Sequence, residues 1–216
     1  MDLFPLYNSA RIALISSAIT FFIGVFAAYY VVKLPEFLRL AADMILTLPL
    51  VLPPTVVGFF ILKALGVNSP IGAFFAAHDI KFIMKWYSSI FATVIVTLPL
   101  MYRAARGSFE SFDYNLKYAA MTLGKSDTWI FWRVIMPGCK GGILAGAVLS
   151  FARALGEYGA TSMVSGYTPG QTATISTTVY QLWRTGHDAA AYRWVLVNLA
   201  VSFAVLAALG FLQRKS

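Results

Sequence analysis

The sequence predicts an all-α polytopic membrane protein with about five transmembrane helices. Hydrophobic residues make up 59% of the 216 residues and charged residues only 12%, a balance far from that of soluble domains. Apolar runs that approach the length of a bilayer-spanning helix alternate with shorter polar connections. We therefore treat residues 1–216 as a single transmembrane domain. Its expected spans lie near residues 12–32, 44–65, 88–102, 141–163 and 194–212.

The first span, residues 12–32, contains no charged residue. As a helix it would be about 31 Å long, which matches the apolar thickness of a bilayer. A cleavable signal peptide is the alternative interpretation. Its apolar core would be shorter, and Asp2 stands where a signal peptide carries basic residues. We expect this helix to be retained.

The second span, residues 44–65, has an unusual centre. Pro49, Pro53 and Pro54 lie close together in the stretch LPLVLPPTVVGF, and each proline removes a backbone donor and clashes with the preceding turn. We expect a kink or a locally unwound helix, which is tolerated at membrane depth only beside protein or a water-filled cavity. The kink could serve packing alone. Alternatively, Pro53, Pro54 and Thr55 could line or frame a transport pathway.

The third span, residues 88–102, follows an external connection at 66–86, and Arg103 and Arg106 mark its expected exit from the membrane. Residues 165–193 are polar and rich in threonine, which predicts an external loop with a short surface or re-entrant helix. This loop could contact an external partner.

The fourth span, residues 141–163, contains Gly142 and Gly146 at a spacing that lets membrane helices approach closely. It also contains Arg153 and Glu157, four residues apart in FARALGEYGAT, which can pair on one helix face. Charges at this depth are costly and are commonly functional. A self-satisfied structural pair is one interpretation. The other places both residues beside a pathway, with Arg153 guiding an anion.

The distribution of basic residues indicates the orientation of the chain. Lys and Arg are more numerous on the side of the central polar segment, 113–140, than on the other side, and Arg214 and Lys215 follow the last span. Because cytoplasmic loops carry the excess of basic residues, this segment is expected inside. Five spans then place the N-terminus outside and the C-terminus in the cytoplasm.

Several functions are excluded by what the sequence lacks. The net charge is +8, but the basic residues are scattered between apolar runs, so we expect no nucleic-acid partner. Cys139 is the single cysteine, and His78 and His187 lack ligand-like spacing, so we expect neither a metal site nor a disulfide. The chain contains no phosphate-binding loop or other catalytic motif. We therefore expect a non-enzymatic chain without a cofactor of its own.

The central segment, residues 113–140, predicts two short helices joined by an elbow at Gly124, with Pro137 ending the second helix. Apolar residues of small and medium size lie among its basic residues. An amphipathic helix of this kind could simply rest on the lipid surface. It could instead present an apolar ridge to another protein in the cytoplasm.

The residues of this segment favour the second interpretation. Ala119, Ala120, Gly124 and Pro137 have the spacing of the pattern Glu-Ala-Ala, three residues, Gly, nine residues, Ile-x-Leu-Pro. The segment thereby resembles the cytoplasmic coupling loop of the membrane subunits of ATP-binding-cassette (ABC) importers. Tyr118 stands where that family usually has Glu.

The resemblance extends over nearly the whole chain. LPLVLPPTVVGF, AAMTLGKSDTWIFWRVIMP and FARALGEYGAT together resemble the permease subunits of molybdate importers, within the branch that carries molybdate, tungstate and sulfate. The resemblance implies the type I ABC importer fold, a place in the cytoplasmic (inner) membrane, and import of molybdate. Because this chain has too few helices to enclose a pathway comfortably, we expect a homodimer with the pathway on its two-fold axis. Tungstate or sulfate is the alternative substrate.

The same resemblance implies the partners and the site residues. The partners would be cytoplasmic ABC ATPase subunits, which bind ATP and Mg²⁺, and an external or periplasmic oxyanion-binding protein. The expected ATPase-docking residues are Tyr118, Ala119, Ala120, Leu123, Gly124 and Pro137. The expected residues of the pathway or its framework are Pro53, Pro54, Thr55, Arg153 and Glu157.

Two other transport classes remain open. An ion-coupled transporter would use Arg153 and Glu157 as its intramembrane charges and would need no ATPase, although the sequence shows no inverted repeat. A passive anion channel would need a ring of such residues and would conduct without ATP.

Overall fold

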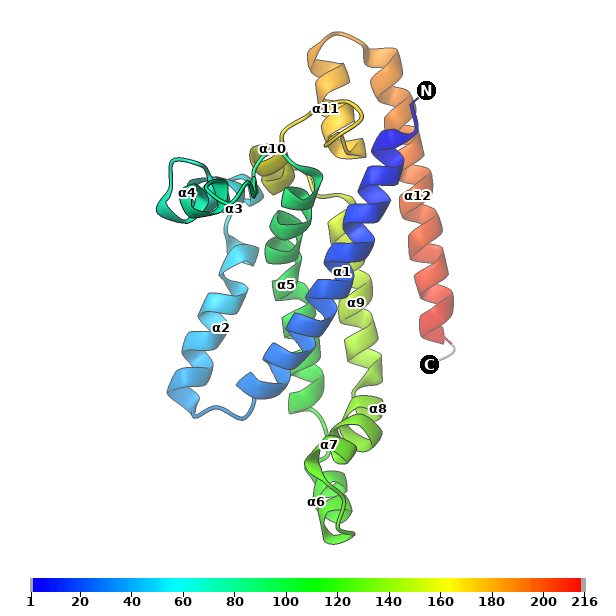
Figure 1. Ribbon diagram of the computed structural model, residues 1–216. Coiled ribbons are helices and arrows are strands. Elements are labelled where there is room, and N and C mark those ends of the chain that lie inside the picture. Colours follow the sequence, from blue (N-terminus) through cyan, green and yellow to red (C-terminus); the bar gives the residue numbers. More distant parts are fainter. Residues whose placement is uncertain (1, 215–216) are drawn as a thin grey trace.

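The computed structural model describes residues 2–214, which form helices joined by turns and include no strand (Figure 1). Three helices are long and apolar enough to cross a membrane, and five spans result if each of two bent helix pairs counts as one. The prediction of an all-α polytopic protein is therefore confirmed. The three long helices are α1 (Phe4–Val31), α5 (Trp86–Glu110) and α12 (Asp188–Arg214).

Helix α5 lies at the centre and packs along α1 and α9 (Lys140–Leu155) (Figure 1). Small residues make these contacts close. A Cβ atom on Gly24 would lie 2.7 Å from Met101 Cγ, and one on Gly146 would lie 2.7 Å from Ala104 Cβ. Gly142 likewise faces Ser108 of α5. The pair Gly142 and Gly146 thus permits the close helix approach that its spacing predicted.

The second expected span is two helices. Helix α2 (Glu36–Val51) and α3 (Pro54–Leu65) meet at 110°, so 44–65 is not one straight helix. Leu52 and Pro53 are extended, because a proline disfavours the helical conformation of the residue before it. The predicted break is therefore present, but its angle turns α3 aside toward the short helix α4 (Pro70–Ala76).

Three other helix boundaries differ from the expected ones. Helix α5 continues two turns beyond residue 102, so Arg103 and Arg106 lie on the helix and not at its exit. Helix α12 begins at Asp188, before the expected start at residue 194, and Lys215 lies outside the described residues. Helix α1 likewise begins at Phe4 and not at residue 12.

The fourth expected span, 141–163, is interrupted. Helix α9 ends at Leu155 and α10 (Gly159–Ser165) begins after a turn. Gly156 is a poor helix former, and the carboxylate of Glu157 accepts a hydrogen bond from Ala160 N (2.8 Å), which starts the second helix anew. The expected short helix of the threonine-rich loop is α11, Ile175–Arg184.

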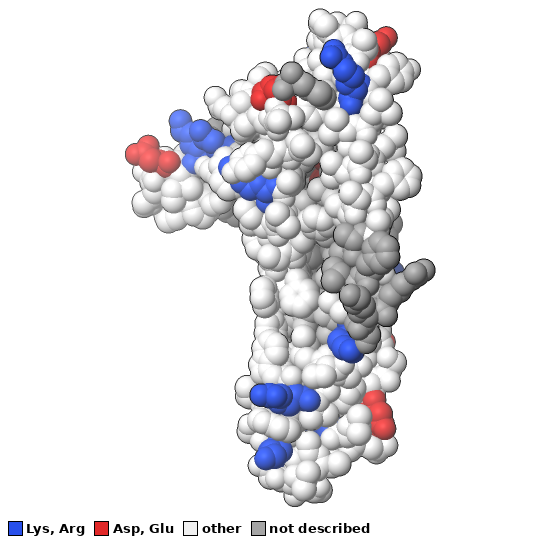
Figure 2. Space-filling view, turned by 90° about the vertical axis from the view of Figure 1, so that its right-hand side faces the viewer, with Lys and Arg blue, Asp and Glu red and all other residues white. Residues whose placement is uncertain are grey.

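The central segment lies at one end of the molecule, and α11 and the N-terminus lie at the other (Figure 1). On the face shown in Figure 2, most charged side chains gather toward the two ends and leave a largely uncharged band between them. Such a band between polar ends is what a bilayer requires, because burying a charge in the hydrocarbon region is costly.

Candidate functional site

The first helix of the central loop is α6 (Tyr114–Thr122), and its two ends are closed by local hydrogen bonds. At the start, the Asp113 side chain accepts from Asn115 N at 3.0 Å. At the end, Gly124 N donates to Met121 O (2.9 Å) and Lys125 N to Ala120 O (3.2 Å). This pair of bonds is the Schellman arrangement, which needs a left-handed residue at its turn. Gly124 supplies it with φ 72°.

The second helix of the loop has three consecutive parts. They are α7 (Asp127–Ile130), a π-helical turn (Phe131–Ile135) and α8 (Met136–Gly138). The helical run ends at Gly138, one residue after Pro137, and the chain bends there by 73° into α9, so the helix ends close to the expected place. The wide π turn directly before Pro137 gives the proline ring room that an α-helical turn would deny it.

The outer surface of the loop is apolar and exposed. Leu123 is 75% exposed and Tyr118 is 59% exposed, and neither has a covering partner among the residues that the structure describes. Ala119 and Gly124 are exposed beside them. Other large exposed side chains of the loop are Leu116, Met121, Trp129 and Trp132. Four of the predicted docking residues thus share one accessible surface.

The inner surface of the loop joins the core of the molecule. Ala120 was predicted to be a docking residue. It is buried in one hydrophobic cluster with residues of α1 and α5, so its side chain is not accessible to a partner. Phe131 packs on Tyr29 of α1 with ring centres 4.5 Å apart. Pro137 is exposed but belongs to the second helix. The inner surface of the loop is therefore packed firmly against the long helices.

Two of the predicted framework residues, Pro54 and Thr55, lie against Gly159, two residues after Glu157. Helix α3 packs on α10, and a Cβ atom on Gly159 would lie 2.9 Å from Pro54 Cβ and 3.1 Å from Thr55 N. Pro53 and Thr55 are exposed next to this contact. The proline-rich stretch and the GEYGAT stretch, a hundred residues apart in sequence, are thus neighbours in space.

Arg153 and Glu157 form the ion pair that their spacing allows. Arg153 Nη1 lies 2.7 Å from Glu157 Oε2, at an angle that gives no well-directed hydrogen bond to this oxygen. The Glu157 side chain is 1% exposed and that of Arg153 is 34% exposed. Because Glu157 Oε1 also caps α10 through Ala160 N, the carboxylate fixes the turn between α9 and α10.

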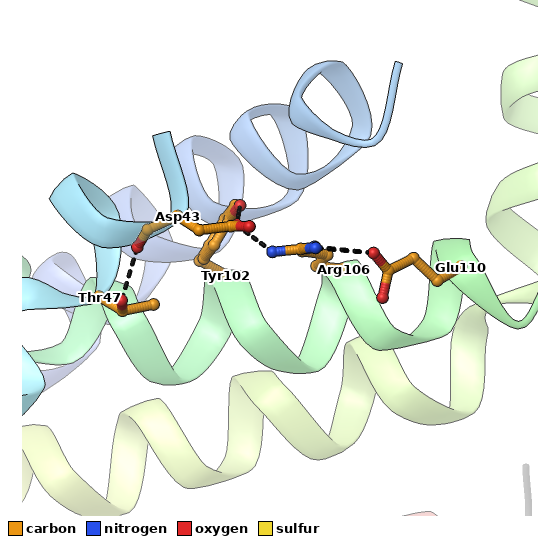
Figure 3. Close-up of polar contacts among 5 residues, drawn as sticks. All are labelled: Asp43, Thr47, Tyr102, Arg106 and Glu110. Atoms are coloured by element: carbon orange, nitrogen blue, oxygen red, sulfur yellow. Dashed lines mark hydrogen bonds and ion pairs between the residues drawn. The ribbon is translucent and has the colours of Figure 1, made fainter. Parts of the chain in front are cut away.

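A second polar cluster, which sequence reasoning missed, joins α2 to α5 (Figure 3). Asp43 of α2 pairs with Arg106 and accepts a hydrogen bond from the Tyr102 hydroxyl. Arg106 also pairs with Glu110, one turn further along α5, at 2.9 Å. Asp43 is a lone carboxylate in an apolar run, and this alone could have identified it. The expected span began one residue later, which excluded it.

No group of His, Cys, Asp or Glu side chains within the described residues could hold a metal ion. Cys139, next to the loop, is buried and donates from its thiol to Ser108 O at 3.3 Å. Burial raises the pKa of this thiol to about 11.

Comparison with known proteins gives consistent results. Residues 20–215 match the family of binding-protein-dependent transport system inner membrane components. The molybdenum transport system permease protein ModB of Escherichia coli is 36% identical over 89% of this chain and 85% of its own length. The sulfate transport system permease protein CysW of Synechocystis is 37% identical, over 90% of this chain and 71% of its own.

A solved structure has the same fold. The crystal structure of a bacterial ABC transporter involved in the import of the acidic polysaccharide alginate superposes with a TM-score of 0.81, over 99% of this chain and 79% of that one. The sequences are 16% identical, so this likeness concerns the fold alone. The fold expected from the resemblance, that of ABC importer membrane subunits, is confirmed.

Proposed function

The chain belongs to the family of binding-protein-dependent transport system inner membrane components, and from this premise we propose that it is the membrane subunit of an ATP-driven molybdate importer. It would span the cytoplasmic membrane with its N-terminus outside and its C-terminus in the cytoplasm. The observation that carries the proposal is the exposed apolar surface of the central loop, mounted on the core of a membrane protein.

This surface suits a cytoplasmic ATPase. Helix α6, which carries Tyr118 and Ala119 and is followed by Leu123 and Gly124, lies in a loop that projects beyond the long helices (Figure 1), and all four residues are exposed. An exposed apolar ridge of this kind is stabilised when it enters a groove on another protein. Ala120 and Pro137 would support the ridge from behind. ATP and Mg²⁺ would be bound by the ATPase, whose movement the loop transmits.

The pathway would form between two copies of the chain. Helix α2 exposes large apolar side chains, including Phe37 at 80% and Val51 at 82%, which a second copy and lipid would cover. A homodimer places the pathway on its two-fold axis. Pro53, Pro54, Thr55, Arg153 and Glu157 would frame the helices beside it. An external oxyanion-binding protein would deliver the anion to the end that carries α11.

Molybdate is favoured over sulfate by the extent of the similarity. The molybdenum permease matches over more of its own length than the sulfate permease does, although the two identities are nearly equal. Sulfate is therefore the second candidate, and tungstate, which has the same charge and tetrahedral shape, must be tested with it.

The proposal is tested by reconstitution into proteoliposomes. The chain is incorporated with its candidate ATPase, and uptake is measured with binding protein loaded with molybdate, tungstate or sulfate. We expect uptake that requires ATP and the loaded binding protein, with molybdate transported fastest. Uptake without nucleotide or ATPase would assign the chain to the ion-coupled transporters or anion channels.

Gly124 tests the docking surface. Asn and Asp both tolerate the left-handed conformation of this residue, but only Asp adds a charge. We expect Gly124→Asp to abolish uptake while the protein still inserts, and Gly124→Asn to retain most of it. Normal uptake by the Asp variant would show that this surface does not bind the ATPase.

A further inference from the structure

Helix α2 is held only lightly by the rest of the chain. None of its residues, all of which the structure describes, is buried. It touches α5 along a narrow strip, where Ala42 and Leu46 lie partly buried against the core. Within this chain, apolar contact therefore contributes little to fixing α2 against α5, and the polar group in that strip, Asp43, makes the specific link between the two helices.

Asp43 is the centre of a network that links the two helices (Figure 3). Its carboxylate pairs with Arg106 and accepts from the hydroxyl of Tyr102, both on α5. Its backbone oxygen accepts from Thr47 Oγ1 at 2.5 Å, within α2. Glu110 also contacts Arg106: its Oε1 accepts a hydrogen bond from Arg106 Nε at 2.9 Å and lies 2.9 Å from Nη2.

The pair is strong where it stands because water is largely excluded. The side chains of Asp43 and Arg106 are 18% and 22% exposed, and the ring of Tyr102 is fully buried. Separating the two charges would leave Asp43 with only the Tyr102 hydroxyl and Arg106 with only Glu110, which costs more in an apolar setting than at a wet surface. The contact between α2 and α5 is therefore specific and has one preferred geometry.

The pair also lies where movement of the central loop enters the helices. Arg106 is one turn from the end of α5, and α5 leads directly into the loop. Phe112, just beyond this end, packs so closely on the loop that a Cβ atom on Gly138 would lie 2.6 Å from its ring. A displacement of the loop therefore displaces Arg106.

The other end of the loop reaches the same helices by a separate route. Helix α9 follows the loop and is tied to α10 through Glu157, and α10 packs on α3, where Gly58 meets Ala160. Since α3 continues from α2, the contacts close a ring from the loop through α9, α10, α3, α2 and α5. The Asp43–Arg106 pair is the joint that closes this ring next to the loop.

We propose that Asp43 and Arg106 are positioning residues that transmit the movement of the central loop to α2 and α3, so that ATP hydrolysis is coupled to anion movement. The proposal rests on the proposed ATP-driven transport. While the ion pair is intact, α2 moves together with α5. Without the pair, α5 and the loop can move and leave α2 in place.

The test compares Asp43→Asn and Arg106→Gln with Glu110→Gln in the reconstituted complex. Glu110→Gln is the matched control, because it removes a charge from the same network while its amide oxygen can still accept from Arg106 Nε, so the link between Asp43 and Arg106 stays intact. Uptake of loaded anion and ATP hydrolysis stimulated by the binding protein are measured together, and their ratio is the readout.

We expect Asp43→Asn and Arg106→Gln to keep stimulated ATP hydrolysis and to lower uptake per ATP by about fivefold or more. Glu110→Gln should leave the ratio unchanged, and Asp43→Glu should restore most of it. An unchanged ratio in the first two variants, or an equal fall of uptake and hydrolysis, would overturn the proposal. The complex without substitutions distinguishes a failure of this proposal from a failure of the proposed function. If that complex shows no ATP-dependent uptake, the proposed function itself is refuted.

Discussion

The contact between α3 and α10 should be sensitive to a single methyl group. Gly58 of α3 has no room for one: a Cβ atom would lie 2.8 Å from Met163 Cβ, 2.9 Å from Ala160 Cα and 3.0 Å from Ala160 O. Two of these three atoms belong to the backbone of α10, which cannot rotate away. Gly58→Ala should therefore force the two helices apart.

The magnitude follows from two opposing effects. Overpacking of this kind costs about 1–3 kcal/mol. Alanine in place of glycine within a helix stabilises the folded protein by about 0.5–1 kcal/mol. The net loss for Gly58→Ala is up to about 2.5 kcal/mol, which corresponds to a Tm lower by up to about 10 °C.

Gly107→Ala on α5 is the matched control. A Cβ atom on Gly107 meets no atom within 4 Å. This variant therefore has the higher helix propensity of alanine without a steric clash. Thermal unfolding of both variants in detergent, followed by tryptophan fluorescence, should show Gly58→Ala below the unsubstituted protein and Gly107→Ala at or above it. Equal shifts of the same sign would refute the close packing of α3 on α10.

Two further predictions concern buried groups. The Cys139 thiol is buried and has a pKa of about 11. At pH 8 it should react with iodoacetamide about a hundredfold more slowly than in the unfolded protein, and the reaction rate should rise about tenfold per pH unit up to the pKa. An equal rate in folded and unfolded protein would contradict the burial of this thiol. Glu157→Ala should lower the free energy of unfolding by about 3 kcal/mol, because it leaves Arg153 unpaired and α10 uncapped. Glu157→Gln should cost about 1 kcal/mol less, since its amide oxygen still accepts from Ala160 N; thermal unfolding compares the two.

The local features of the central loop could be predicted from sequence because they depend on neighbouring residues. Gly124 adopts the left-handed conformation that ends α6, and Ser126 accepts from Trp129 N at the start of α7. The break before Pro54 is local in the same way. The helix end near Pro137 was predicted to within one residue, but the π turn directly before this proline was not.

Which side of each helix is covered could not be predicted. The sequence placed Ala119 and Ala120 together in a docking surface, but Ala120 is buried against the core and Ala119 is exposed. The partners of Asp43, Tyr102 and Arg106, could not be predicted, because they lie about sixty residues away on another helix. Contacts at such separations depend on how the helices pack, which no local pattern specifies.

The sequence by itself determined the class of protein, the apolar segments, the glycine elbow and the family resemblance, because hydropathy and turn chemistry act over a few residues. It also determined that Arg153 and Glu157 could pair, since four residues separate them on a helix. Only the tertiary structure decided that α3 turns aside onto α10, that Glu157 caps the helix after the turn, and that Asp43 and Arg106 join α2 to α5. These outcomes arise from the mutual packing of distant helices, where a missing Cβ or a shielded charge pair selects one arrangement among many.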